Sequence, residues 1–316
     1  MNPWYKDYSS LLAEKFPGVK VQKISVDAGF SCPNRDGTIS TGGCIYCNNR
    51  SFSPSYCQPS LSVSQQINEG KAFFARKYPK MKYLAYFQAY TSTFNSDTAH
   101  LLSLYHEALA QTDVIGLVIG TRPDCLPLPL LDALAEINRR HTVMIELGAE
   151  TSHNPTLRLI NRGHSWQQTI EAVLACNARG LDVGLHLIAG LPGETEEDVL
   201  QTVRRASLLP ISSIKLHQLQ IIRDTPLQRM VSNGTLSPRL FTPERYLQLC
   251  LRIVDIVPRS IAIERFVSQA PAELLVAPRW GLKNYQFTDR LHKLLGSRNV
   301  KNQEAEDYPS ISSPQL

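Results

Sequence analysis

The sequence predicts an α/β fold built on one parallel sheet. Short apolar runs alternate with amphipathic helical segments along most of the 316 residues. The apolar runs are continuous, as expected for parallel strands that are covered on both faces. Six or seven strand–helix units can be distinguished, fewer than the eight of a closed barrel. We therefore expect a partial (β/α)6, TIM-like barrel.

The expected elements follow one another in a regular order. Strands are predicted at residues 22–28, 83–88, 114–119, 142–147, 182–188, 213–219 and 261–266. Between them, residues 97–110 and 130–137 each carry one apolar stripe at helical spacing. Ser165 with Gln168, and Thr195 with the acids that follow it, are typical helix starts.

One catalytic domain accounts for most of the chain. A hydrophobic content of 43% over this length is enough for a single large core. We expect the domain to span residues 1–296, with residues 1–20 as an N-terminal extension. Residues 297–316 are polar and rich in Pro and Ser, which predicts a flexible C-terminal tail.

The amino-acid composition also indicates the cellular compartment of the protein. The seven cysteines are odd in number and irregularly placed, which favours a reducing compartment over a secreted disulfide scaffold. The N-terminus lacks an apolar signal segment, and no stretch approaches the ~18 apolar residues of a membrane span. We therefore expect a cytoplasmic protein without a membrane partner. The net charge of +5 is compatible with an RNA partner but does not establish one.

Three cysteines after the first expected strand are the strongest chemical signal. Cys32, Cys44 and Cys47 form a C-x11-C-x2-C pattern in a glycine-rich loop. Three thiolates from one loop could hold a [4Fe-4S] cluster whose fourth iron stays open for chemistry. A structural zinc site with Cys57 as fourth ligand is the alternative. Against zinc, Cys57 stands alone, with neither a second paired cysteine nor a nearby His.

The loop resembles a known family. Residues Ser31–Cys47 contain the words CPNRDGT and GGCIYC, and they resemble the cluster-binding loop of the radical S-adenosylmethionine (SAM) enzymes, in a bacterial branch similar to the Elongator catalytic subunit. Most of that superfamily has three residues between the first two cysteines, but a long first gap is typical of this branch. The resemblance extends from about Lys20 to about Leu295.

The resemblance implies a reaction and its cofactors. A [4Fe-4S] cluster on the three cysteines would cleave SAM to a 5′-deoxyadenosyl radical, with the electron supplied by flavodoxin or ferredoxin. The implied substrate is the C5 side chain of a wobble uridine in tRNA. Two alternatives remain open at this stage. One is a radical SAM enzyme acting on a small metabolite or tetrapyrrole, and the other is a zinc-stabilised RNA-binding protein without catalysis.

The resemblance also implies SAM-binding residues, which should lie beyond the carboxyl ends of the strands. Tyr46 precedes the last cysteine of the loop. Gln88 and Ala89 would lie near the SAM amino group, Glu150 at the ribose hydroxyls and Arg162 at the carboxylate. Glu146, by the alternation of its strand, should point elsewhere.

The fifth strand ends in a glycine turn. Gly190 and Gly193 lie between a strand and a capped helix, where glycines permit close approach of the backbone to a nucleotide. Ile188 would then lie against the adenine face. We expect His186, which is surrounded by apolar residues, to be a core histidine.

The sixth strand predicts a polar cavity inside the barrel. Lys215 and His217 should share one face of this strand and Gln218 the other. Inward polar groups indicate a substrate cavity instead of a packed core, and Glu264 would lie in its wall. Substrate-side candidates are Lys215, His217, Gln218, Arg223 and Arg265.

Other cations have simpler explanations. Arg122 could bind SAM or a phosphate, but the favoured interpretation is an ion pair with Asp124 at the barrel rim. Several lysines could follow an RNA backbone, although solvated surfaces explain scattered lysines more often. These are Lys15, Lys20, Lys23, Lys77, Lys80 and Lys82.

Overall fold

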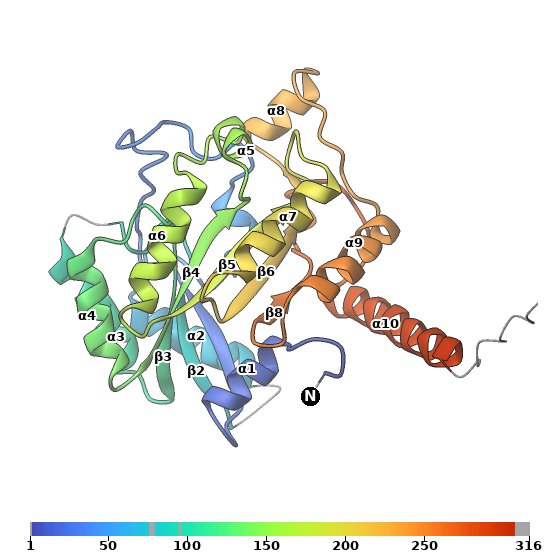
Figure 1. Ribbon diagram of the computed structural model, residues 1–316. Coiled ribbons are helices and arrows are strands. Elements are labelled where there is room, and N and C mark those ends of the chain that lie inside the picture. The colour runs from blue at the N-terminus through green and yellow to red at the C-terminus, as the bar shows by residue number, and fades with distance from the viewer. Residues whose placement is uncertain (1, 76–79, 95–96, 307–316) are drawn as a thin grey trace, which may run out of the picture.

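The computed structural model describes residues 2–75, 80–94 and 97–306. Seven parallel strands form one sheet in the order β1-β2-β3-β4-β5-β6-β8 (Figure 1). Their bounds are β1 Val21–Val26, β2 Lys82–Phe87, β3 Val114–Thr121, β4 Thr142–Glu150, β5 Asp182–Ala189, β6 Ser213–Gln218 and β8 Ala262–Arg265. Strands adjacent in sequence are adjacent in the sheet apart from the intervening β7, with β1 and β8 at its two edges. The partial barrel predicted from the sequence is confirmed.

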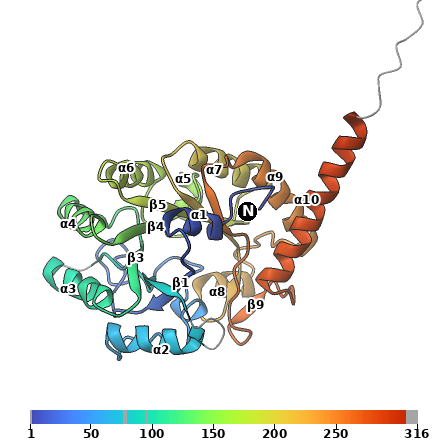
Figure 2. The same ribbon diagram turned by 90° about the horizontal axis from the view of Figure 1, so that it is seen from below.

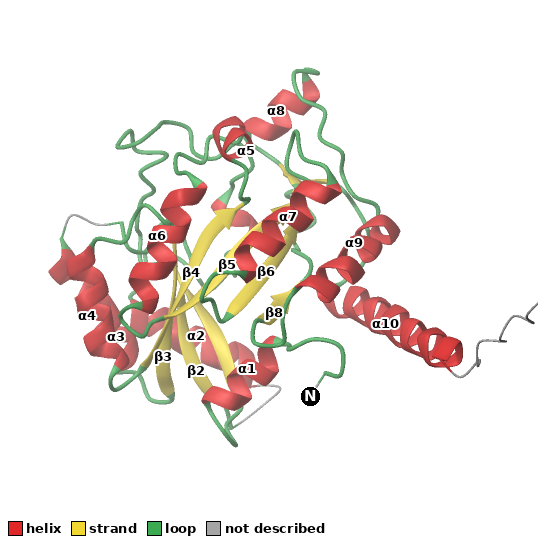
Figure 3. Cartoon of the chain, in the orientation of Figure 1, coloured by secondary structure: helices red, strands yellow, loops and turns green. Residues whose placement is uncertain are grey.

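Helices cover the outer face of this sheet, as Figure 3 shows in red around the yellow strands. The covering helices are α2 Val63–Ala75, α3 Thr98–Leu109, α4 Leu128–Asn138, α6 Trp166–Asn177, α7 Glu196–Ser207 and α9 Pro243–Ile256. Outward residues such as Ile24, Leu117 and Ile145 are fully buried in the core between strands and helices. The predicted capping boxes at Ser165 and Thr195 begin α6 and α7.

Several shorter elements lie outside the main sheet and its covering helices. Helices α5, Asn154–Leu159, and α8, Pro226–Ser232, lie at the top in Figure 1, near the cysteine loop. The 3-10 helix Asn49–Ser51 continues that loop, and β7, Ile221–Ile222, pairs with β9, Leu275–Ala277, as a separate antiparallel ribbon. None of the helices in the described ranges is both long and apolar enough to span a bilayer.

The N-terminal extension closes the amino end of the barrel. Its helix α1, Tyr8–Lys15, lies inside the ring of helices when the molecule is viewed from below (Figure 2). Leu11 and Leu12 pack against Val118 and Met144, which point inward from β3 and β4. Because α1 fills this end of the barrel, the cavity is left at the carboxyl ends of the strands.

The last helix extends into the segment that the sequence predicts to be a flexible tail, residues 297–316. Helix α10 runs over Asn284–Glu306, so residues 297–306 are helical. This segment contains neither Pro nor Gly, the two residues that most disfavour a helix interior. The rest of the predicted tail, residues 307–316, lies outside the described residues.

Candidate active site

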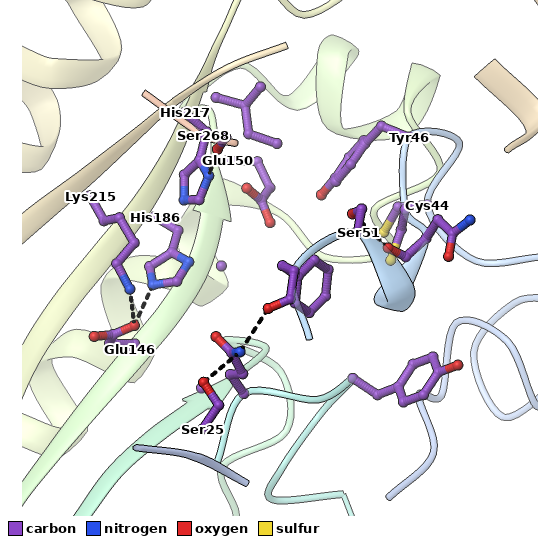
Figure 4. Close-up of a pocket in the computed structure, with 18 of the residues that line it drawn as sticks. Ser25, Cys44, Tyr46, Ser51, Glu146, Glu150, His186, Lys215, His217 and Ser268 are labelled. Atoms are coloured by element: carbon purple, nitrogen blue, oxygen red, sulfur yellow. Dashed lines mark hydrogen bonds and ion pairs between the residues drawn. The ribbon is translucent and has the colours of Figure 1, made fainter. Parts of the chain in front are cut away.

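The carboxyl ends of the strands surround a cavity of ≈ 510 Å³. Cys32, Cys44 and Cys47 all line it, together with side chains that point inward from the strands. Figure 4 shows Cys44 on one side of this cavity and the network around Glu146 on the other. The site is therefore one chamber with a thiol end and a charged end.

The cysteine loop is held in place by the segment that follows α5. Ile45 N–H donates to the carbonyl of Ile160 at 3.1 Å, and the Asn161 side chain donates to the carbonyl of Gly43 at 2.9 Å. The Asn34 side chain donates in return to the Asn161 carbonyl. Asn161 has a φ of +52°, a left-handed conformation that Asn tolerates. These bonds fix a loop that has little regular structure of its own.

Cys44 lies beside a buried cation. Arg162 Nη1 is 3.5 Å from Cys44 Sγ, while Arg162 Nη2 donates to the Gly148 carbonyl at 2.7 Å and lies 3.4 Å from Glu150 Oε1. Burial alone would lower the pKa of Arg162, but Tyr46, Cys44 and Glu150 raise it well above its usual range. Arg162 is therefore a permanent buried cation in contact with both Cys44 and Glu150.

Cys57 lies apart from this group. It is buried but does not line the cavity. Burial and the neighbouring Asp27 raise the pKa of its thiol to about 12. The structure therefore does not place Cys57 as the fourth ligand of a zinc site.

The spacing of the thiols differs from that of a single-ion site. Across the described ranges, no three His, Cys, Asp or Glu side chains are close enough to hold one metal ion. A [4Fe-4S] cluster binds each thiolate at a different iron, so its ligands do not have to converge on one point. Burial, and after it Cys44, raises the pKa of Cys47 to about 12, so the two thiols are near enough to interact.

Two buried polar atoms beside the thiols lack partners. Arg122 forms the predicted pair with Asp124 through Nε at 2.9 Å and Nη2 at 2.8 Å, but its Nη1 has no hydrogen bond. Thr91 Oγ1 is also buried and unbonded, and both residues line the cavity. Unpartnered buried polar atoms are rare in folded proteins. These two fit a polar ligand such as the methionine part of SAM.

The sequence did not single out Thr91, and it favoured the ion pair over a ligand role for Arg122. Their positions in the sequence could have indicated both residues. Thr91 follows the end of β2 and Arg122 follows the end of β3, and active sites of parallel barrels form at these strand ends.

Most, but not all, of the predicted cofactor residues reach the cavity. Those that line it are Tyr46, Gln88, Glu150, Arg162 and Ile188. Ala89, Gly190 and Gly193 do not line it. A side chain at Gly190 would instead meet the ring of Phe241 at 3.0 Å, so this glycine accommodates a packing contact. The Gln88 side chain is partly occupied, because it donates to Ser25 Oγ at 2.9 Å.

Four charged side chains cross the barrel at the other end of the cavity. Lys23 pairs with Glu146 and, at 2.8 Å, with Glu264. Lys215 pairs with Glu146 at 2.7 Å and with Glu264 at 2.8 Å. Each of the four carboxylate oxygens therefore has a lysine partner, and the four residues come from β1, β4, β6 and β8.

This network corrects two expectations from the sequence. Lys23 is buried in the barrel and cannot contribute to an RNA-binding surface. Of the other lysines in that expectation, Lys15 pairs with Asp182 and Lys82 with Asp113, while Lys77 lies outside the described residues. His186, expected to be a core histidine, is instead half-buried and lines the cavity, with Nε2 2.6 Å from Glu146 Oε2.

The ion pairs of these lysines and glutamates shift the pKa values of the titratable groups around them. Burial would raise the pKa of Glu146, but Lys215, Lys23 and His186 lower it well below its usual range. Burial and Lys215 lower the pKa of His186, and burial and Arg265 lower that of His217 well below its usual range. Both histidines are therefore neutral at pH 7 and face the cavity with rings 5.4 Å apart.

The predicted substrate side is largely brought together. Lys215, His217, Gln218 and Arg265 line the cavity, although the alternation of β6 predicted Gln218 on the face opposite Lys215 and His217. Gln218 donates to the carbonyl of Ser268 at 3.0 Å. Arg223 is exposed and does not line the cavity.

The fold and the cavity together define a barrel enzyme with its chemistry at the carboxyl ends of the strands. A sequence profile of the radical SAM superfamily matches residues 36–206, and a profile of the radical SAM C-terminal domain matches residues 211–296. The chain belongs to the radical SAM superfamily. Enzymes of this superfamily use a [4Fe-4S] cluster and SAM.

Individual proteins are also similar to this chain. The chain is 34% identical to the Bacillus subtilis protein YtqA over 287 residues, covering 91% of this chain and 88% of YtqA. It is 24% identical over 190 residues to a tRNA uridine(34) acetyltransferase of Methanocaldococcus infernus, covering 59% of this chain and 34% of that protein.

A solved structure has the same fold. It is the archaeal Elp3 of Methanocaldococcus infernus with an N-terminal deletion, which superposes with a TM-score of 0.67 at 17% identity. The match covers 89% of this chain and 64% of the Elp3 chain.

The charged network predicts a large and pH-dependent contribution of Glu146 to stability. Glu146→Gln should lower the free energy of unfolding by about 3 to 5 kcal/mol, because it leaves Lys23 and Lys215 with one carboxylate between them. This difference in stability between wild type and variant should have its full size above the unfolded carboxyl pKa of about 4.3. It should shrink as pH falls through the much lower folded pKa of Glu146.

Urea unfolding at several pH values would measure this difference. Glu197→Gln is the matched control, since Glu197 pairs with Arg204 and Arg252 at the exposed surface and should leave stability unchanged. Equal effects of the two substitutions would show that the network does not stabilise the barrel.

Proposed function

We propose that Cys32, Cys44 and Cys47 hold the [4Fe-4S] cluster and that this enzyme modifies the C5 side chain of a wobble uridine in tRNA. The observation that supports the cluster assignment is the position of the three thiols: they come from one loop and line the same cavity as the unpartnered atoms of Thr91 and Arg122. Cys57, the remaining cysteine near the loop in sequence, does not line the cavity.

When bound, the cluster and SAM would supply radical chemistry able to abstract hydrogen from an unreactive carbon. The chain's own residues bind, orient and exclude water. Arg162, which lies beside Cys44, would neutralise the carboxylate of SAM at the thiol end. Glu150 is buried, lines the cavity and can accept hydrogen bonds from ribose hydroxyls. Helix α1 closes the opposite end of the barrel to solvent.

Three observations support a tRNA substrate. One relative is named for uridine 34 of tRNA. The charged and amide side chains of the cavity wall can hydrogen-bond a nucleobase. The chain carries a net charge of +5, which suits a polyanionic partner. A one-electron donor such as flavodoxin or ferredoxin would complete the system.

The cluster assignment predicts a sharp difference among cysteines. Changing Cys32, Cys44 or Cys47 singly to Ala should abolish the brown colour and the bound iron, because two thiolates do not retain the cluster. Cys57→Ala should keep about four irons and four sulfides per chain. Iron and acid-labile sulfide analysis measures both, and loss of the cluster in Cys57→Ala would mean that the ligand set is misassigned.

The SAM assignment predicts a role for Glu150. Glu150→Gln should keep the iron content but weaken SAM binding by roughly 1 to 3 kcal/mol, because a buried acceptor of hydrogen bonds is lost. Equilibrium dialysis with labelled SAM gives the affinity. The exposed Glu171 on α6 offers the control Glu171→Gln, and the same affinity in both variants would remove Glu150 from the site.

The substrate assignment predicts salt-sensitive binding to tRNA. Cluster-loaded protein should bind an anticodon stem-loop with an affinity that falls steeply as salt rises, with a log-log slope that corresponds to only a few phosphate contacts. Cells lacking the gene should also lose one modified wobble nucleoside, measured by mass spectrometry of digested tRNA. Absence of binding at low salt together with an unchanged nucleoside profile would favour a small metabolite or tetrapyrrole as substrate.

A further inference from the structure

Arg265 is a cation of the cavity wall without an acidic partner. The other buried or half-buried cations of this wall each have one: Lys23 and Lys215 pair with two glutamates, Arg122 with Asp124, and Arg162 with Glu150. In the part of the chain that the structure describes, no carboxylate forms an ion pair with Arg265. Its Nε is buried and makes no hydrogen bond.

A register shift in the sheet explains how Arg265 reaches the cavity. Ile214 of β6 is paired with Ile263 of β8, but Lys215 is paired with Arg265, so Glu264 is passed over. Side chains of a regular strand alternate between its faces, and a bulge breaks that alternation. As a result, the consecutive residues Glu264 and Arg265 both line the cavity. Glu264 is occupied by the two lysines, and Arg265 is left without a carboxylate.

The neighbours of Arg265 hold it without neutralising it. Its Nη2 lies 3.1 Å from Nδ1 of His217, and the hydroxyl of Ser268 contacts the same ring nitrogen. Burial, and then the charge of Arg265, lowers the pKa of His217 well below its usual range, so the ring stays neutral. Lys23, Lys215 and Arg265 against Glu146 and Glu264 leave one positive charge at this end of the cavity.

We propose that Arg265 binds an anionic group of the substrate, a carboxylate or a phosphate, at the charged end of the cavity. A guanidinium forms its strongest hydrogen bonds with oxyanions, often through two parallel N–H groups, and Arg265 has an unbonded Nε beside its Nη atoms. The group belongs either to the tRNA or to a separate small co-substrate. This inference shares one assumption with the proposed function, namely that the substrate binds in this cavity.

Calorimetric titration of the full chain, loaded with cluster and SAM, tests this site with malonate and inorganic phosphate as probes. The wild type should bind one equivalent of at least one probe. Arg265→Gln should weaken this binding by about 10- to 150-fold, the loss expected for a hydrogen bond to a charged group. Arg140→Gln is the matched control, because Arg140 is exposed just before β4, at the amino end of the barrel.

Failure of the wild type to bind either anion, or equal binding by Arg265→Gln, would overturn the proposal. If Arg265→Gln does not retain iron, the variant Ser268→Ala is used in its place. Loss of the Ser268 hydroxyl frees the His217 ring that contacts Arg265, so anion binding should weaken. Unchanged anion binding in this variant would count against the site. Competition between the anion and an anticodon stem-loop would assign the group to the tRNA, and simultaneous binding would assign it to a co-substrate. Because the main titration uses neither RNA nor SAM cleavage, its outcome is independent of the tRNA assignment.

Discussion

The ion pairs among Lys23, Glu146, Lys215 and Glu264 connect strands that are far apart in the sequence and opposite in the barrel. Two lysines and two glutamates inside a barrel are tolerable only as a complete set, since an unpaired buried charge is strongly destabilising. The set lies above the apolar layer that α1 forms with Val118 and Met144. It therefore marks the boundary between the packed lower part of the barrel and the open cavity.

This boundary gives the cavity its two ends. Strand positions above it carry polar or small residues, such as Ser25, Gly120 and Gly148, and leave space below the cysteine loop. At the thiol end, Arg162 contacts Cys44 and Glu150 together, so one cation connects the proposed cluster ligand to the proposed SAM-binding carboxylate. At the charged end, the neutral histidines and Arg265 face the space for a substrate. A reaction between a cofactor and a substrate needs such an arrangement, with both held in one chamber.

Local patterns predicted much of this structure. The seven strands follow the apolar runs closely, and the helix starts at Ser165 and Thr195 have the hydrogen bonds that their sequences indicate. The three cysteines were recognisable because they lie within one short loop. Long-range pairing was not predictable in the same way: Lys23 and Glu264 are 241 residues apart, and strand alternation alone does not show which inward residues meet. The bulge that turns Arg265 inward has no sequence signature, and neither does the plugging role of α1.

We propose that SAM binds the open iron of a [4Fe-4S] cluster held by this cysteine loop. Electron paramagnetic resonance of the reduced protein, recorded without and with SAM, would detect this binding. We predict the signal of a reduced [4Fe-4S] cluster whose g values shift when SAM is added, because a ligand joins the iron that lacks a cysteine. A fully loaded cluster whose spectrum is identical with and without SAM would contradict the claim.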